Sequence, residues 1–476
     1  MVTWQGRLAW HTALLGALSA QPGNAADRTD PFATQKLRPP AASSFWKGPA
    51  SACSPTPAAP DPLRLQDAVD LALCNNPQTR ESWANAKATA AALGIAQSAY
   101  LPTIDGSVRV QRDEIRNAPG SAGATSLNAA LTLNYLLFDF GGRNANTELA
   151  RQSLLAANWA HNNTLQVVLL NAVQAYYQLF ATQEAVQSAN SSERASLTSF
   201  EATRARLRVG NATRADVLQA QTAYSQAQLN RTQSEGDAAN ARGILANALG
   251  LPADRELNIA QPPDYQARQV GERAVSELID IARARRPDLA AAEAQVRAAE
   301  SNVRVQQSFG KPTLSLFGHL GATQVVPGPD PLSGAIGLQI SIPLFTGFQS
   351  SYQTLQAREQ LELQQASRDR LATDVTLEVW RAYQDLRTQQ QALTTAGELL
   401  ASAQESYNVA LARYRAGVGT ITDLLNAQSA LASAELQVIQ ARYRWNLAKA
   451  TLAKAIGVLE PDLVSRSPAG AYPPAR

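Results

Sequence analysis

The chain has 476 residues with 42 basic and 39 acidic side chains, which gives a formal net charge of +3. This chain is longer than one that folds around a single ordinary globular core. Because basic and acidic residues nearly balance, the composition is not that of a protein that binds nucleic acid or a strongly anionic surface through excess positive charge. Aromatic residues make up only 6% of the chain. Ala, Gln, Leu, Arg and Ser dominate the long middle stretches, which suits long helices packed through small side chains.

The first 26 residues resemble an export signal. One arginine precedes an apolar run around Leu8–Leu18, and small residues follow up to Ala26. Neither this run nor any later stretch reaches the roughly 18 apolar residues that a transmembrane helix needs, so we expect none. Residues 27–62 are rich in Pro, Ala and Ser and predict an extended, poorly ordered segment, and the tail at 459–476 is similar.

The two cysteines are Cys53 and Cys74. In an exported protein such a pair suits a disulfide, which would tie the Pro-rich segment to a helix beginning near Leu65. The alternative is two unpaired thiols.

The middle of the chain is duplicated. Residues 206–250 align with residues 413–457, and the matching corners read RVGNATRADVLQAQ and RAGVGTITDLLNAQ. Earlier parts also correspond, so we place a first structural repeat at 63–262 and a second at 263–458.

Each repeat contains one very long helical stretch. The segment from Arg143 to Val209 has no Gly or Pro. The segment from Gln349 to Ala416 has no Pro and a single glycine, Gly397. At about 1.5 Å per residue each would be roughly 90–100 Å long, so it must pack against other helices along its length.

Each repeat also contains two segments in which apolar and polar residues alternate, which predicts strands with one apolar and one polar face. They lie near 101–115, 125–138, 312–326 and 333–345. One interpretation is a soluble sheet that rests on a core. The other is a membrane sheet, because about 10 residues of tilted strand cross an outer membrane.

Four strands cannot close a membrane barrel alone, because open edges leave backbone groups unpaired in lipid. Three chains would supply 12 strands and leave a passage, whereas the 8 strands of two chains would be filled by side chains. The predicted fold is therefore a mixed α and β membrane protein. A trimeric 12-stranded transmembrane β-barrel, with four strands per chain, continues into a long α-helical barrel.

The doubled order of helices, strand pairs and corners, with LLFDFGGR at 136–143 and PLFTGF at 343–348, resembles the TolC family of outer-membrane channel proteins. The likeness covers about residues 63 to 458 and implies a homotrimer in the outer membrane with a large periplasmic helical portion. It also implies docking to a periplasmic adaptor and an inner-membrane ABC-type transporter, with no cofactor.

Within this family the chain looks most like the outer-membrane components of type I secretion systems for adenylate cyclase–haemolysin toxins. The expected cargo is therefore a secreted protein. Small-molecule efflux is the alternative, because both processes use the same kind of tube.

The corners are the candidate functional sites. Gly210 and Gly417 predict helix ends with positive φ, and Thr213 and Thr420 suit N-caps. The exposed corner surfaces are the predicted docking sites for the adaptor, formed by Arg208, Gly210, Thr213, Arg415, Gly417 and Thr420.

The acidic residues of the corners allow two interpretations. Asp216 and Asp423 suit helix capping and the helix dipole. By resemblance, Asp216, Tyr414 and Asp423 instead take the positions of the family's channel gate. Asn426 stands where a second ring acid is expected and Gly419 where an arginine is expected, which predicts a weaker gate.

An enzyme is not expected. The three histidines show no metal-ligand spacing, and the chain has neither a nucleophile elbow nor a phosphate-binding loop. A soluble periplasmic coiled-coil adaptor is the remaining rival, but it would not need four strands of membrane length.

Overall fold

The computed structural model describes residues 30–38, 60–116, 121–262, 274–326 and 331–459. The predicted signal peptide, nearly all of the predicted C-terminal tail and Cys53 lie outside these residues. The bridge between Cys53 and Cys74 therefore stays a prediction.

The chain divides into two compact units. The first, here called the sheet unit, contains the described residues within 1–38, 87–154 and 297–361. The second, the helical unit, contains those within 39–86, 155–296 and 362–476.

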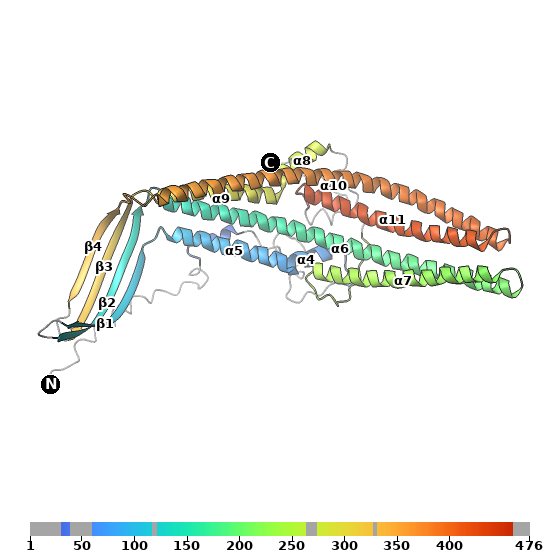
Figure 1. The fold of residues 1–476 in the computed structure, drawn as a ribbon, viewed down its shortest axis with the longest axis horizontal. Helices are drawn as coiled ribbons and strands as arrows, with labels where there is room; N and C mark the ends of the chain where they lie inside the picture. The colour runs from blue at the N-terminus through green and yellow to red at the C-terminus, as the bar shows by residue number, and fades with distance from the viewer. Residues whose placement is uncertain (1–29, 39–59, 117–120, 263–273, 327–330, 460–476) are drawn as a thin grey trace, which may run out of the picture. The chain divides into compact units, whose positions relative to one another are not determined.

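The two halves of the chain repeat one order of elements, with helices of 11, 22, 67 and 35 residues in each half (Figure 1). The first half consists of α4 Leu65–Asn75, α5 Pro77–Ser98, β1 Thr103–Arg116, β2 Ser121–Phe138, α6 Gly142–Arg208 and α7 Arg214–Ala248. The second half consists of α8 Val275–Arg285, α9 Pro287–Ser308, β3 Thr313–Val326, β4 Leu332–Ser341, α10 Gln349–Arg415 and α11 Ile421–Ala455. The internal duplication indicated by the sequence is therefore visible in the fold.

Helices α6 and α10 confirm the two long helices predicted from the sequence. No proline interrupts either, and each presents apolar residues three or four positions apart to a core. In α6 these are Val168, Leu169, Ala172, Val173 and Tyr176, and in α10 they are Val375, Val379, Ala382 and Leu386.

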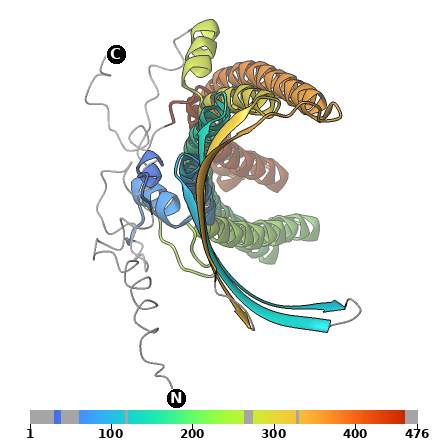
Figure 2. The same ribbon diagram turned by 90° about the vertical axis from the view of Figure 1, so that its left-hand side faces the viewer.

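The four strands form one antiparallel sheet in the order β1-β2-β3-β4. Figure 2 shows that the strands are strongly curved. Strands β1, β2 and β3, of 14, 18 and 14 residues, are longer than the roughly 10 residues that cross an outer membrane. Strand β4 ends at Ser341 rather than near 345, because Pro343 has no N–H to donate to the ladder.

A short segment before the first repeat also folds. Within the stretch expected to be extended, Thr34–Leu37 form a 3-10 turn, η2, and Thr34 is buried. Gln35 Nε2 donates to the Lys87 carbonyl at 3.2 Å, so η2 is attached to α5 in the sheet unit.

A buried tyrosine organises the core of the helical unit. The Tyr176 hydroxyl lies 3.0 Å from the Leu63 carbonyl oxygen and 2.6 Å from that of Ala260. Residues Leu63 and Ile259 form an isolated parallel bridge beside it. Tyr176 therefore ties the chain after α7 to the chain before α4.

A charged cluster lies at the junction between α8 and α9. Arg286, 5% exposed, pairs with Asp288 at 2.6 Å and Glu378 at 2.5 Å, and it donates to the Ala455 carbonyl at 3.1 Å. Burial acts to raise the pKa of Asp288 and of Glu378, but hydrogen bonds from the cations of the cluster bring both below their ordinary values.

The first half of the chain uses a neutral group at the equivalent position. Asn76, between α4 and α5, donates to the Ala248 carbonyl at 3.1 Å. The duplicated fold therefore fixes the end of each returning helix from the same place, once with an amide and once with a charged network.

Candidate functional site

The sheet separates its residues into an apolar and a polar face. One row across the sheet pairs Ile104, Leu133, Gly318 and Ile336. The next row pairs Asp105, Thr132, His319 and Ala335. The register continues this alternation, and the apolar face comprises Ile104, Val108, Val110, Leu127, Leu131, Leu133, Tyr135, Leu314, Leu316, Leu320, Leu332, Ile336, Leu338 and Ile340.

No core covers the apolar face in the part of the chain that the structure describes. Ile104 is 71% exposed, Val108 75%, Ile336 76% and Leu338 65%. A face of this extent marks contact with lipid or another protein rather than with water. The interpretation of a soluble sheet resting on its own core is therefore wrong.

The sheet also has two open edges. Strands β1 and β4 are its outermost members, and each pairs on one side only among the described residues. Unpaired edge groups are costly in lipid, so a membrane position requires further copies of the chain to cover these edges.

Two corners join the long helices to the returning helices. Gly210 and Gly417 have φ of 77° and 76°, as the sequence predicted, and the space beside both is open. A side chain is therefore disfavoured there by backbone conformation alone.

The corner acids cap the returning helices. The Asp216 carboxylate accepts from the Thr213 amide at 2.7 Å, and the Asp216 amide donates to the Thr213 hydroxyl at 3.2 Å. Asp423 and Thr420 repeat this reciprocal pair at 3.3 and 3.1 Å. The Thr420 hydroxyl and amide hold the pKa of Asp423 below its ordinary value. The capping role is thus present in both corners, and the gate role stays a prediction.

Tyr414 connects the second corner to α6. Its hydroxyl lies 3.0 Å from Thr203 Oγ1, and its side chain is buried. The Arg206 guanidinium lies 4.1 Å above the Tyr414 ring and donates to the Tyr414 carbonyl at 2.8 Å. Within one chain, Tyr414 therefore pairs with α6 rather than with Asp216.

Thr203 and Arg206 were not among the site residues predicted from the sequence. A signal was available for Arg206, because it aligns with Arg413 in the repeat. Its partner lies 208 positions away in the chain, so no local pattern revealed the contact.

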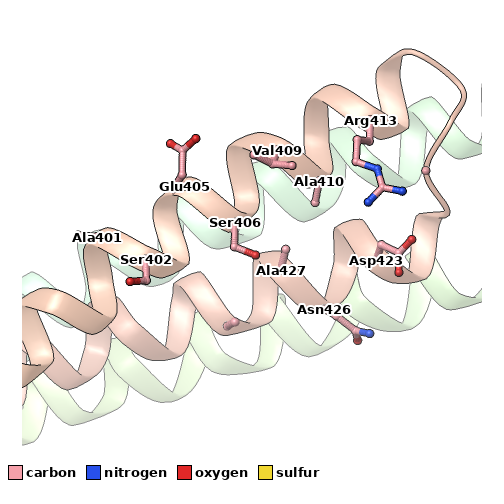
Figure 3. A pocket seen from close by; sticks show the side chains of 12 residues that line it. Ala401, Ser402, Glu405, Ser406, Val409, Ala410, Arg413, Asp423, Asn426 and Ala427 are labelled. Atoms are coloured by element: carbon pink, nitrogen blue, oxygen red, sulfur yellow. The ribbon is translucent and has the colours of Figure 1, made fainter.

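The predicted gate residues divide between two hollows. A groove of about 560 Å³ between the corners is lined by Asp216, Tyr414, Arg415, Gly417 and Thr420, together with Arg206 and others. A second, of about 940 Å³ between α10 and α11, is lined by Asp423 and Asn426 with Glu405 and Arg413 (Figure 3). Of the predicted docking residues, Arg208, Gly210 and Thr213 line neither hollow.

The surrounding backbone leaves little room for a side chain at position 419. A Cβ atom there would lie 3.0 Å from Arg413 Cβ and 3.1 Å from the Tyr414 amide nitrogen. The corner backbone thus passes directly against the end of α10, and an arginine at this position would force the corner to move.

Polar contacts join α6 to α11 farther from the corners. Ser188 donates to Glu435 at 2.5 Å, and Gln428 donates to Ser196 at 3.0 Å in a buried position. Together with the Tyr414 contacts, they hold the two helical hairpins of one chain side by side.

Among the helices that the structure describes, none combines the length and apolar character needed to cross a membrane.

Comparison with known proteins identifies the family. The sequence profile described as outer membrane efflux protein matches residues 68–251 and 278–458. The chain belongs to this family. Protein CyaE of Bordetella pertussis is 32% identical over 79% of this chain and 80% of its own length. Outer membrane efflux protein BepC of Brucella suis is 27% identical over 84% of this chain and 86% of its own length.

Solved structures support the same fold. The open state of the outer membrane channel MtrE of Neisseria gonorrhoeae is similar with a TM-score of 0.73 at 22% identity, over 84% of this chain and 90% of that one. The TolC-type fold predicted from the sequence is therefore confirmed. The family match confirms the predicted outer-membrane location. Members of this family are channel proteins and not enzymes.

Proposed function

We propose that this chain is the outer-membrane exit duct of a type I secretion system that exports a protein toxin of the adenylate cyclase–haemolysin type. The duct gives the cargo a path across the periplasm and the outer membrane. No chemistry on the cargo is required, and the energy comes from the inner-membrane transporter.

The channel part of the proposal rests on the sheet, which has one apolar face, one polar face and two open edges. Three copies supply 12 strands, so that β1 of one chain meets β4 of the next and both edges are paired. The apolar face then meets lipid, and the polar face, with Asp105, Arg109, Asn128 and His319, lines a water-filled passage. Channels of this family are homotrimers that work with adaptors and inner-membrane transporters, which supports the same assembly and partners here.

The corners form the closed end of the passage in this proposal. Six corners of a trimer surround the axis, and Asp216, Tyr414, Asp423 and Asn426 belong to the gate. Arg208, Arg415 and the corner backbone around Gly210 and Gly417 form the surface that meets the adaptor.

Similarity to CyaE supports a protein cargo, because its 32% identity exceeds the 27% of BepC, whose name describes efflux. The family description itself favours the second candidate, small-molecule efflux.

A deletion strain separates the two. Toxin in the medium and sensitivity to hydrophobic drugs are measured before and after complementation with the wild-type gene. Loss of exported toxin with unchanged drug sensitivity is the expected result. Unchanged toxin export with increased drug sensitivity would replace the proposal by the efflux function.

A further inference from the structure

Within one chain, the paired strands β2 and β3 continue into a pair of helices. Strand β2 leads into α6, and α9 leads into β3. Arg297 Nε on α9 donates to Gln152 Oε1 on α6 at 3.0 Å. Nearer the sheet, a Cβ atom at Gly142 would lie 2.6 Å from the Ser308 hydroxyl oxygen. Helix α9 therefore lies along α6, beyond the strands that these helices flank.

The outer strands of the sheet are flanked by the other two helices. Helix α5 leads into β1, and β4 leads into α10. In the duplication Pro77 of α5 corresponds to Pro287 of α9, and Gly142 of α6 corresponds to Gln349 of α10. Where β4 of one copy pairs with β1 of the next, α10 and α5 should therefore meet as α6 and α9 do within the chain.

The exposure of equivalent residues on α9 and α5 supports this contact. Ser301 and Val305 of α9 are buried, and Val305 is 9% exposed. Their counterparts on α5 are Ala91 and Ile95, which are exposed, and Ile95 is 74% exposed. The face that α9 buries is thus open on α5.

Helix α10 shows the complementary difference from α6. Ala145 and Gln152 of α6 are buried, whereas their counterparts on α10, Tyr352 and Glu359, are exposed. The counterpart of the contact between Arg297 and Gln152 would join Lys87 on α5 to Glu359 of a second copy. These side chains carry opposite charges, so the open face of α5 fits the open face of another copy's α10.

A short segment before the first repeat is folded onto α5. We call residues 30–38 the strap. The Asp30 carboxylate closes the turn, because it accepts from the Thr34 amide at 3.0 Å and from the Gln35 amide at 2.8 Å. Thr34 is 1% exposed, and Gln35 donates to the Lys87 carbonyl.

Gly94 provides the space that the strap occupies. A Cβ atom there would lie 3.4 Å from Thr34 Oγ1. At the equivalent position α9 carries Arg304, whose exposed side chain donates to Ser301 at 2.8 Å. An arginine at position 94 would extend into the space that Thr34 fills, so the two repeats differ at the residue that admits the strap.

The strap borders the open face of α5. It contacts α5 at Lys87 and Gly94. Ala91 lies between them at helical spacing, on the same side of the helix. A helix that packs on Ala91 and Ile95 would therefore have the strap at its flank.

We propose that the strap forms one wall of the seat on α5 that receives α10 of a second copy, and thereby holds neighbouring copies together. This inference rests on the proposed function, in which β1 of one copy pairs with β4 of the next. Ala91 is small and Tyr352 is large, so the two helix faces are complementary in size. The strap adds contact area at the rim of the seat.

Dissociation of the assembled protein tests the role of the strap. The full-length protein is compared with a variant without residues 30–38, with Gly94→Arg and with the combination of both changes. Gly94→Ala is the matched control, because its Cβ atom fits beside Thr34 at 3.4 Å. Native mass spectrometry in detergent measures the dissociation constant, and circular dichroism measures helical content.

The deletion and Gly94→Arg are each expected to raise the dissociation constant severalfold, and Gly94→Ala to leave it unchanged. In the chain without the strap, Gly94→Arg should add nothing, because the arginine has no strap to displace. Wild-type dissociation of the deletion variant would overturn the inference and keep the channel. An equal effect of Gly94→Arg with and without the strap would also overturn it. A wild-type protein that forms no trimer would instead contradict the proposed function.

A cross-link decides the matter if these variants fail to fold. Photoreactive benzoylphenylalanine replaces Lys36, an exposed residue of the strap, in the otherwise unchanged protein. We expect a product that joins two chains, with the adduct within residues 349–361 at the start of α10. Adducts confined to the chain that carries the label would overturn the inference.

Discussion

Replacing Arg206 by alanine tests how the two hairpins of one chain are held together at the corners. The substitution removes the guanidinium that lies 4.1 Å above the Tyr414 ring and its 2.8 Å hydrogen bond to the Tyr414 carbonyl. It leaves the capping pairs of both corners intact. In the proposed channel, separation of α10 from α6 widens the tunnel end, and this separation should therefore become easier.

The contacts set the size of the effect. A cation–π contact contributes about 0.5–2 kcal/mol and a hydrogen bond from a charged group about 1.5–3 kcal/mol. Because Arg206 is only half-buried, the lower part of these ranges applies. A combined loss of about 2–3 kcal/mol per chain shifts the closed-to-open equilibrium roughly 30- to 150-fold.

Single-channel recording in planar bilayers measures this shift as an increase in open probability. Arg208→Ala is the matched control, because Arg208 is exposed at the end of the same helix. Tyr414→Phe should give a smaller change, about 1 kcal/mol or roughly fivefold, because Thr203 keeps its 2.8 Å bond to the Ser199 carbonyl. An Arg206→Ala channel that opens no more often than the Arg208→Ala channel would show that the Arg206 contacts do not hold the corners together.

Three further predictions concern stability and docking. Arg286→Leu leaves Asp288 without its paired cation and Glu378 with Lys454 alone, at 2.8 Å. It should lower the free energy of unfolding by about 3 kcal/mol in chemical denaturation, whereas the exposed Arg283→Leu should not; equal losses would contradict the role of the cluster. Burial lowers the pKa of His161 below 6.5 in the folded chain, so the unfolded chain protonates this imidazole more readily. The stability that neutral His161 contributes is therefore complete above that pH and is lost as pH falls. His161→Gln should flatten the drop in thermal stability between about pH 7 and pH 5, and an unchanged slope would argue against this role. Charge reversal at Arg208 or Arg415 should abolish toxin export from cells while trimers still form, and normal export by both variants would remove these residues from the docking surface.

Much of the fold follows from local patterns in the sequence. The long helices were predictable because no proline interrupts residues 143–209 or 349–416 and the apolar residues recur at helical spacing. The two faces of the sheet were predictable from period two, and the corners from Gly210 and Gly417. These features depend on residues close together in the chain.

The details of the sites depend on distant contacts. Neither the Tyr414–Thr203 pair, 211 positions apart, nor the register shift between Leu136 and Phe138 has a local signature. The corner acids were recognised, but only the structure shows that Asp216 and Asp423 line different hollows. Local sequence patterns therefore predict helices, strands and turns, whereas the packing of helices on one another decides which side chains come into contact.

In the proposed trimer, three chains close one barrel by pairing β1 with the β4 of a neighbour. Cysteine pairs scanned along β1 and β4, one in each strand, are oxidised in the native outer membrane and the products are separated under denaturing conditions. We predict that matching registers give a ladder ending at three linked chains. A ladder that stops at two chains, or no linked product in any register, would contradict the closed three-chain barrel.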